Sequence, residues 1–141
     1  MVALLIEALG DVATGAVPVT VDRHTLYKRR WRATAADGSE LAVNLDVPAE
    51  IGAILESADG RRFRVEQEEE EVLVIKLPTR TDLAAKVGWY LGNRHLPVEV
   101  REDEILLERL QSLADSLDRI GIPYSFRTDT LRCASHSSHT H

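Results

Sequence analysis

Histidine is the residue type whose placement suggests chemistry, because three of the five histidines lie within the last six residues of the chain. There His136, His139 and His141 alternate with serine and threonine, and purification tags usually repeat histidine without such interruptions. A histidine-rich segment without large apolar residues cannot pack into a core. Neutral imidazoles bind borderline cations such as Ni²⁺, Cu²⁺ and Zn²⁺. The tail is therefore predicted to bind metal.

His95 stands in a different setting, the segment Gly-Asn-Arg-His-Leu-Pro at 92–97. Gly92 and Asn93 are residue types at which helices commonly end, and the residue before Pro97 is driven toward extended geometry. We therefore expect His95 on an exposed turn just past a helix C-terminus, where the helix dipole favours a cation. From the residues alone, metal ligation and an ordinary hydrogen-bonded surface histidine both remain open.

The other candidate ligands are weaker. Cys133 lies three residues before His136, a possible Cys-x-x-His pair, but one such pair is poor evidence for a site. It is the single cysteine, so no intrachain disulfide can form and a reducing compartment is expected. His24 is predicted to be structural or solvated, because positive charge disfavours a bound cation and its neighbours include Arg23, Lys28, Arg29, Arg30 and Arg32.

Two charged segments carry their own alternatives. The basic stretch at 23–32 is either a docking face for an acidic partner peptide or the polar face of an edge strand, where charge discourages aggregation. The glutamates at 66 and 68–71 mark a change of composition. Consecutive glutamates on a strand alternate between faces and cannot converge on one ion, so this run is predicted to be a solvated linker or edge between two domains.

Composition narrows the class of protein. The 141 residues permit one ordinary domain or two small ones, and 44% hydrophobic with 28% charged residues indicates a folded chain. The net charge of -6, with histidines counted neutral, argues against a nucleic-acid partner. Residues 1–10 lack a positive n-region and a cleavage pattern, and no apolar run approaches the roughly 20 residues of a membrane span. We expect a soluble cytoplasmic protein with no membrane partner.

The first half is predicted to be a small β-rich domain. Strands are expected over 2–9, 17–21, 26–35, 40–45, 54–56 and 62–65. Pro18 cannot donate to a sheet ladder, so the second strand should lie at an edge. Asp37-Gly38 and Asp59-Gly60 predict two hairpins, because both residue types tolerate positive φ.

In the second half of the chain, the spacing of apolar residues alternates between that of strands and that of helices. A buried strand at 72–77 is followed by a helix that Thr79 or Thr81 can cap, a hairpin of 98–101 with 104–107, and a last strand at 124–127. Between the hairpin and the last strand, Gly121 and Pro123 should end an amphipathic helix, whose apolar face is formed by Leu106, Leu110, Leu113, Leu117 and Ile120. The order βαββαβ is that of a ferredoxin-like fold. The chain is thus predicted to be α+β, with domains at 1–70 and 71–132 and a flexible histidine-containing tail at 133–141.

The block Gly-Asn-Arg-His at 92–95 resembles the signature of the urease accessory protein UreE family, because it ends a helix after an apolar strand and precedes the hairpin at Asp103-Glu104-Ile105. The likeness extends over nearly the whole chain. It implies that residues 1–70 are peptide-binding-like and that residues 71–132 bind metal and dimerise. It further implies that His95 binds Ni²⁺ at a homodimer interface and that the tail histidines add ligands.

The resemblance implies a nickel metallochaperone and no enzyme. Such a protein hands Ni²⁺ to a complex of urease apoprotein with other accessory proteins, including a GTPase. The absence of a nucleophile elbow, a phosphate-cradling glycine motif and HExxH agrees with a non-enzyme. A nickel or zinc buffer or storage protein, and an adaptor that acts through the β-rich domain, remain alternatives, and Zn²⁺ or Cu²⁺ could fill the site in vitro.

Symmetry makes the His95 site plausible. One imidazole binds a metal weakly, but a two-fold axis brings His95 of both protomers to one ion. Ten residues separate Phe126 from His136, which an extended chain spans with at most about 33 to 36 Å. Some family members carry further histidines in the second half of the ferredoxin-like domain, or long polyhistidine tails. This chain has neither, so a high metal count per dimer is not expected.

Overall fold

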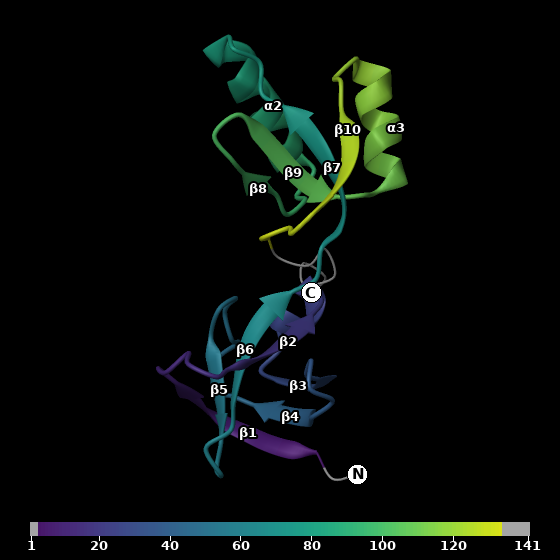
Figure 1. The fold of residues 1–141 in the computed structure, drawn as a ribbon. Coiled ribbons are helices and arrows are strands. Elements are labelled where there is room, and N and C mark those ends of the chain that lie inside the picture. The colour runs from purple at the N-terminus through teal and green to yellow at the C-terminus, as the bar shows by residue number, and fades with distance from the viewer. Residues whose placement is uncertain (1–2, 134–141) are drawn as a thin grey trace. The chain divides into compact units, whose positions relative to one another are not determined.

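The structure is a computed structural model that describes residues 3–133. The chain forms two compact units that part between Glu68 and Glu69. Both units are mixed, and in the described part of each the strands outnumber the helices (Figure 1). The fold is therefore of the α+β class. Within residues 3–133, no helix has both the length and the apolar character that a membrane crossing requires.

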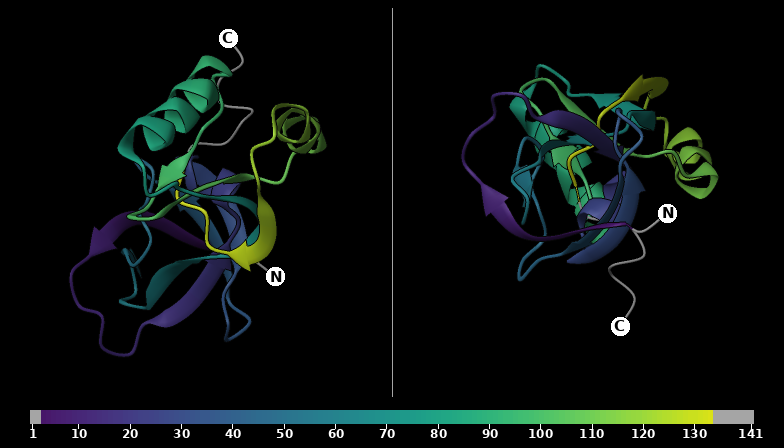
Figure 2. Two further views of the ribbon diagram at one scale, coloured as in Figure 1. Left: turned by 90° about the horizontal axis from the view of Figure 1, so that it is seen from above. Right: turned by 60° about the horizontal axis from the view of Figure 1, so that its bottom comes forward.

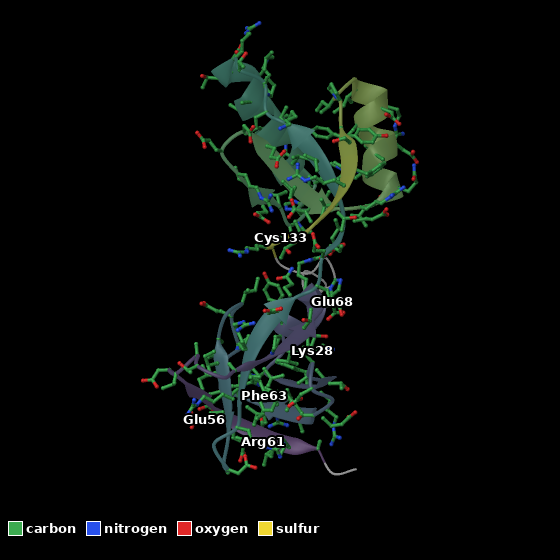
Figure 3. The ribbon with its side chains drawn as sticks, in the orientation of Figure 1. Lys28, Glu56, Arg61, Phe63, Glu68 and Cys133 are labelled. Atoms are coloured by element: carbon green, nitrogen blue, oxygen red, sulfur yellow. The ribbon has the colours of Figure 1, made fainter. Side chains whose placement is uncertain are left out.

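The first unit contains one six-stranded mixed sheet with the order β2-β6-β5-β1-β4-β3. Its strands are β1 (Leu4–Gly10), β2 (Val17–Val21), β3 (Arg30–Thr34), β4 (Glu40–Asn44), β5 (Ile54–Ser57) and β6 (Arg62–Gln67). Alternate side chains of these strands form a core, which includes Ile6, Leu55 and Phe63, the last labelled in Figure 3. The strands β2, β3, β4 and β6 bury alternate side chains, as the period of a strand requires, whereas β1 buries Ile6 alone.

Most local predictions for the first unit are confirmed. Gly38 (φ 88°) and Gly60 (φ 86°) turn the hairpins β3–β4 and β5–β6, and β2 with Pro18 is an edge strand. The strand expected over 26–35 is wrong at its start. Residues Arg23–Leu26 form a short helix, α1, and β3 begins only at Arg30. The cause is Asp22, whose carboxylate accepts the Thr25 N–H at 2.9 Å and caps α1.

The second unit has the element order β-α-β-β-α-β that the sequence predicts. It comprises β7 (Glu70–Lys76), α2 (Thr81–Asn93), β8 (Glu99–Val100), β9 (Glu104–Glu108), α3 (Gln111–Ile120) and β10 (Ser125–Asp129). The four strands form an antiparallel sheet with the order β10-β7-β9-β8. Both helices pack on one face of it through residues such as Val87, Leu91, Leu113 and Leu117 (Figure 1 and Figure 2).

Three details of the second unit differ from expectation. Leu106 lies in β9, so the last helix starts at Gln111, and the helical spacing from Leu106 is coincidental. The N-cap of α2 is Arg80, and the described chain shows no side-chain hydrogen bond that caps this helix. The glutamate run is only partly a linker: the boundary between the two units falls between Glu68 and Glu69, but Glu66 lies in β6 and both Glu70 and Glu71 lie in β7.

Residues 130–133, here called the C-terminal strap, cross the sheet face that the helices leave open. Leu131 and Cys133 are buried there against Val72, Val74 and Leu106. At the β8 edge, the Arg132 N–H donates to Glu99 Oε1 at 2.7 Å. Cys133, labelled in Figure 3, was expected to begin the flexible tail, yet it is part of the packed sheet face. The predicted ligands His136, His139 and His141 lie outside the described residues.

Candidate metal site

His95 is exposed on the turn that follows α2, where the sequence places it. The turn is closed by two backbone hydrogen bonds, from the Arg94 N–H to Leu91 O at 3.1 Å and from the His95 N–H to Gly92 O at 3.0 Å. The predicted helix end is confirmed, since Asn93 is the last residue of α2. The left-handed backbone that closes the helix falls on His95 itself (φ 55°).

This backbone conformation is unusual for a residue with a side chain. Among the described residues, His95 is the one non-glycine residue with a positive φ. The other residues with positive φ are all glycines, namely Gly15, Gly38, Gly52, Gly60 and Gly121. A left-handed conformation costs an L-residue about 1 kcal/mol or more, and histidine is among the side chains that tolerate it best. The turn therefore holds an imidazole where glycine would be the less strained choice.

The flanking residues fix this turn on both sides. On the helix side, the Arg94 guanidinium lies 5.7 Å from the Tyr90 ring centroid, and its Nη1 donates to the Tyr90 hydroxyl at 3.4 Å. On the other side, Leu96 and Val98 are half-buried against the helical core. The exposed imidazole thus projects from an anchored piece of backbone, as a positioned ligand should.

The outer face of α2 leads to this turn. Ala85, Gly88 and Gly92 are exposed at spacings of three and four residues, and His95 follows three residues later. A Cβ added at Gly88 or Gly92 would meet no described atom within 4 Å. Beside this stripe the Trp89 side chain is 70% exposed. A stripe of small residues therefore leads to His95, and a large exposed apolar side chain lies beside it.

An apolar hollow of about 580 Å³ adjoins Trp89. It lies between α2 and the end of α3, and its walls include Leu83, Tyr90, Ile120 and Ile122. Leu83 and Ile120 are exposed large hydrophobic residues, as is Trp89. Clusters of exposed apolar side chains of this kind mark contact surfaces in soluble proteins.

Possible metal ligands are scattered over the described part of the chain. Within residues 3–133, no three His, Cys, Asp or Glu side chains are arranged so that they could hold a metal ion. His24 is exposed on α1 in the first unit, and Cys133 is buried in the C-terminal strap. His95 is therefore the one histidine among the described residues of the second unit, and its imidazole is exposed.

Sequence comparison decides the family. Residues 70–141 match the family model described as the C-terminal domain of the UreE urease accessory protein. Over 126 residues the chain is 32% identical to the urease accessory protein UreE of Staphylococcus carnosus, covering 87% of this chain and 83% of that protein. The chain belongs to the UreE family of urease accessory proteins. The resemblance drawn from Gly-Asn-Arg-His is confirmed.

A second UreE relative shows the extent of the likeness. The protein of Cereibacter sphaeroides is 29% identical over 120 residues, which are 85% of this chain and 63% of that relative. The UreE model begins at Glu70, the first residue of β7, and therefore includes α2, the His95 turn and the C-terminal strap. UreE proteins are accessory chaperones of urease and not enzymes, and the family membership implies a nickel metallochaperone role.

The UreE part of the chain also contains an ion network that the sequence analysis missed. Glu104 is buried on β9, and Arg127 of β10 donates to its carboxylate, with Nη1 at 3.0 Å from Oε2. Arg127 holds the pKa of Glu104 below its usual value, although burial alone would raise it. Asp129 joins Arg127 to Arg101, whose Nη2 also donates to Thr130 O at 3.2 Å. This network anchors the start of the C-terminal strap.

Proposed function

We propose that this protein is a homodimeric nickel metallochaperone that delivers Ni²⁺ for assembly of the urease active site. One observation carries the proposal beyond family membership. The exposed imidazole of His95 is held in a left-handed turn at the end of a helix whose outer face carries two exposed glycines beside the exposed Trp89. A helix surface of this kind is suited to a symmetric contact that brings two imidazoles together.

The dimer is proposed to form through α2. Two exposed glycines in a helix each cost about 1 kcal/mol relative to alanine, so a monomer gains nothing from Gly88 and Gly92. In a two-fold contact the same surface meets itself, and small residues let the two backbones approach closely. Trp89 would lose its exposure in the same contact. An axis near the C-terminal end of α2 then places His95 of each protomer beside its mate.

The domain roles follow the family. Residues 71–132 are proposed to be a ferredoxin-like metal-binding and dimerisation domain, which the strand order and the one-sided helices support. Residues 1–70 are proposed to be the peptide-binding-like domain. Nickel is the cargo, and partners would be urease apoprotein and other accessory proteins, including a GTPase, in the cytoplasm. Zn²⁺ or Cu²⁺ could occupy the same nitrogen ligands in vitro.

His136, His139 and His141 are proposed to complete the coordination around the pair of His95 imidazoles. The C-terminal strap supports this arrangement, because Arg132 is hydrogen bonded to Glu99, four residues after His95 in the chain. From Cys133, three residues of chain extend at most about 10 Å to His136. Outer ligands on a short tether would let the carrier both bind and release its metal.

The metal site is tested with His95→Gly. This change removes the imidazole and leaves a residue that accepts the left-handed backbone without strain, unlike alanine. Calorimetric titration of the full chain with Ni²⁺ should show loss of the tightest site, while weaker binding by the tail persists and the fold is retained. His24→Gly serves as the control in the first unit. Unchanged tight binding by His95→Gly would show that His95 is no ligand.

The dimer surface is tested with Gly88→Ala. The new methyl group meets no described atom within the chain, so the helix should gain about 1 kcal/mol of stability. In the proposed dimer two such methyl groups overpack the contact, so the dimer Kd should rise about tenfold or more. Sedimentation measures association, and urea unfolding at high dilution measures stability. Ser112→Ala on α3 is the control, and a more stable protein with unchanged dimer Kd would exclude this face of α2.

A further inference from the structure

Three arginines of the first unit differ from most others in the chain. Arg29, Arg30 and Arg32 are exposed in or next to β3, and none of them forms an ion pair with a described carboxylate. Arg30 Nε donates to the neutral Asn44 Oδ1 at 3.1 Å. Elsewhere six arginines each pair with a carboxylate, namely Arg61, Arg64, Arg80, Arg101, Arg109 and Arg127. In a chain with a net charge of -6, no described carboxylate neutralises these three guanidinium groups.

Strand register places an apolar residue beside them. Leu5 of β1 pairs with Ala42 of β4, and Ala42 pairs with Arg32 of β3, so the three residues form one row across the sheet. The Leu5 side chain is 55% exposed. Asn44 of β4 and Arg30 of β3 form the next cross-strand pair on the same face of the sheet. Because Ala42 is small, the surface is hollowed there, and the depression has a volume of about 450 Å³.

Acidic residues limit this surface but do not neutralise it. Glu40, two residues before Ala42 on β4, accepts a hydrogen bond from the Thr34 hydroxyl at 3.2 Å. Glu7 is exposed on β1, two residues after Leu5. The positive charge is therefore confined to the part of β3 that contains Arg30 and Arg32, next to the apolar surface of Leu5.

We propose that this face of β1, β4 and β3 docks an extended acidic segment of a partner protein, an inference that rests on the peptide-binding-like role proposed for residues 1–70 and specifies its site and ligand charge. Carboxylates of the segment pair with Arg30 and Arg32, and an apolar side chain between them enters the depression against Leu5 and Ala42. A guanidinium group matches a carboxylate with two parallel hydrogen bonds, which gives the contact its direction. Nucleic acid fits less well, because its affinity grows with the number of phosphates neutralised and few cations are present here. The surface is independent of the nickel site.

The two tryptophans allow a direct test. Trp31 lines the depression, is buried, and its Nε1 has no hydrogen-bond partner among the described residues. Trp89 is in the second unit, so Trp89→Phe leaves Trp31 as the sole tryptophan of the full chain. The probes are a ten-residue peptide of alternating glutamate and leucine, its lysine–leucine counterpart, and a single-stranded oligonucleotide of ten nucleotides. Trp31 fluorescence and calorimetry are recorded in parallel.

We expect saturable binding of the glutamate peptide alone, weakened by added salt. Arg32→Gln should raise its Kd about fivefold to tenfold, because one charge-assisted hydrogen-bonding group is lost. Arg61→Gln is the matched control, since that arginine pairs with Asp59 in the β5–β6 turn and should leave the Kd unchanged. No calorimetric binding of the glutamate peptide, or equal effects of both substitutions, would overturn the proposal. Tighter binding of the oligonucleotide would overturn it in favour of a nucleic-acid site.

Discussion

Leu131→Ala tests whether the C-terminal strap belongs to the folded second unit. Leu131 is fully buried and packs with Val72, Val74, Leu106 and Cys133. Truncating a buried leucine to alanine removes about 2 kcal/mol of transfer free energy and leaves a cavity, for a total of about 2 to 5 kcal/mol. The strap is a single segment that can settle onto the sheet after truncation. We therefore expect the lower part of that range, about 2 to 3 kcal/mol.

Urea unfolding of the full chain measures this loss. Val100→Ala is the matched control, because Val100 lies in the adjacent β8 with a side chain that is 66% exposed, and should cost less than about 0.5 kcal/mol. Removal of residues 134–141 should leave both the fold and the dimer intact, since that segment contains no core-forming residue. If Leu131→Ala costs no more than Val100→Ala, the strap is not docked in solution and its proposed guidance of the tail fails.

Two further predictions concern the ion network and the metal. Arg127→Met should lower the free energy of unfolding at pH 7, because Glu104 would stay buried with Lys76 at 3.4 Å and Arg101 at 3.9 Å as its remaining cations. The pKa of Glu104 in the folded protein lies below its ordinary value of 4.5. The stability that the ionised Glu104 contributes is therefore present above pH 4.5 and is lost as pH falls through the folded pKa. The loss of stability in acid should consequently be smaller in Arg127→Met than in the parent protein. Acidification to about pH 5 should release Ni²⁺ from the intact protein, as equilibrium dialysis would show, because a protonated imidazole has no lone pair for the metal.

Local signals explain why so much of the fold could be predicted. Asp37-Gly38 and Asp59-Gly60 determine their turns within four residues, and Gly121 with Pro123 ends α3 as a left-handed cap must. The alternation and the helical period of the apolar residues then determine which face of each element is buried. The order of strands and helices follows from these signals, because no distant contact is needed to produce them.

The errors in the predicted elements arise where a contact distant in sequence, or a segment of very few residues, determines the local structure. α1 has four residues, too few for a periodic pattern, and depends on the single cap from Asp22. Leu106 has helical spacing from Leu110, yet β-sheet pairing with Val74 outweighs that pattern. Leu131 is buried against a sheet face that β7 and β9 form together. The residues next to Leu131 in the sequence give no sign of this distant contact. Ion partners such as Glu104 and Arg127, 23 residues apart, are hidden for the same reason.

The position of the His95 turn was predictable, but its strain was not, and that strain bears on function. Helix α3 ends in the favourable way, with Gly121 at φ 77°. Helix α2 reverses the usual placement, because it keeps Gly88 and Gly92 in helical conformation and gives the left-handed position to His95. Alanine at 88 and 92 with glycine at 95 would stabilise a lone chain by about 3 kcal/mol, a substantial part of a typical 5 to 15. These three residues therefore lower the stability of a lone chain. A contact between two protomers explains them better than folding of the monomer does, because such a contact needs small residues on the helix surface and an imidazole at its end.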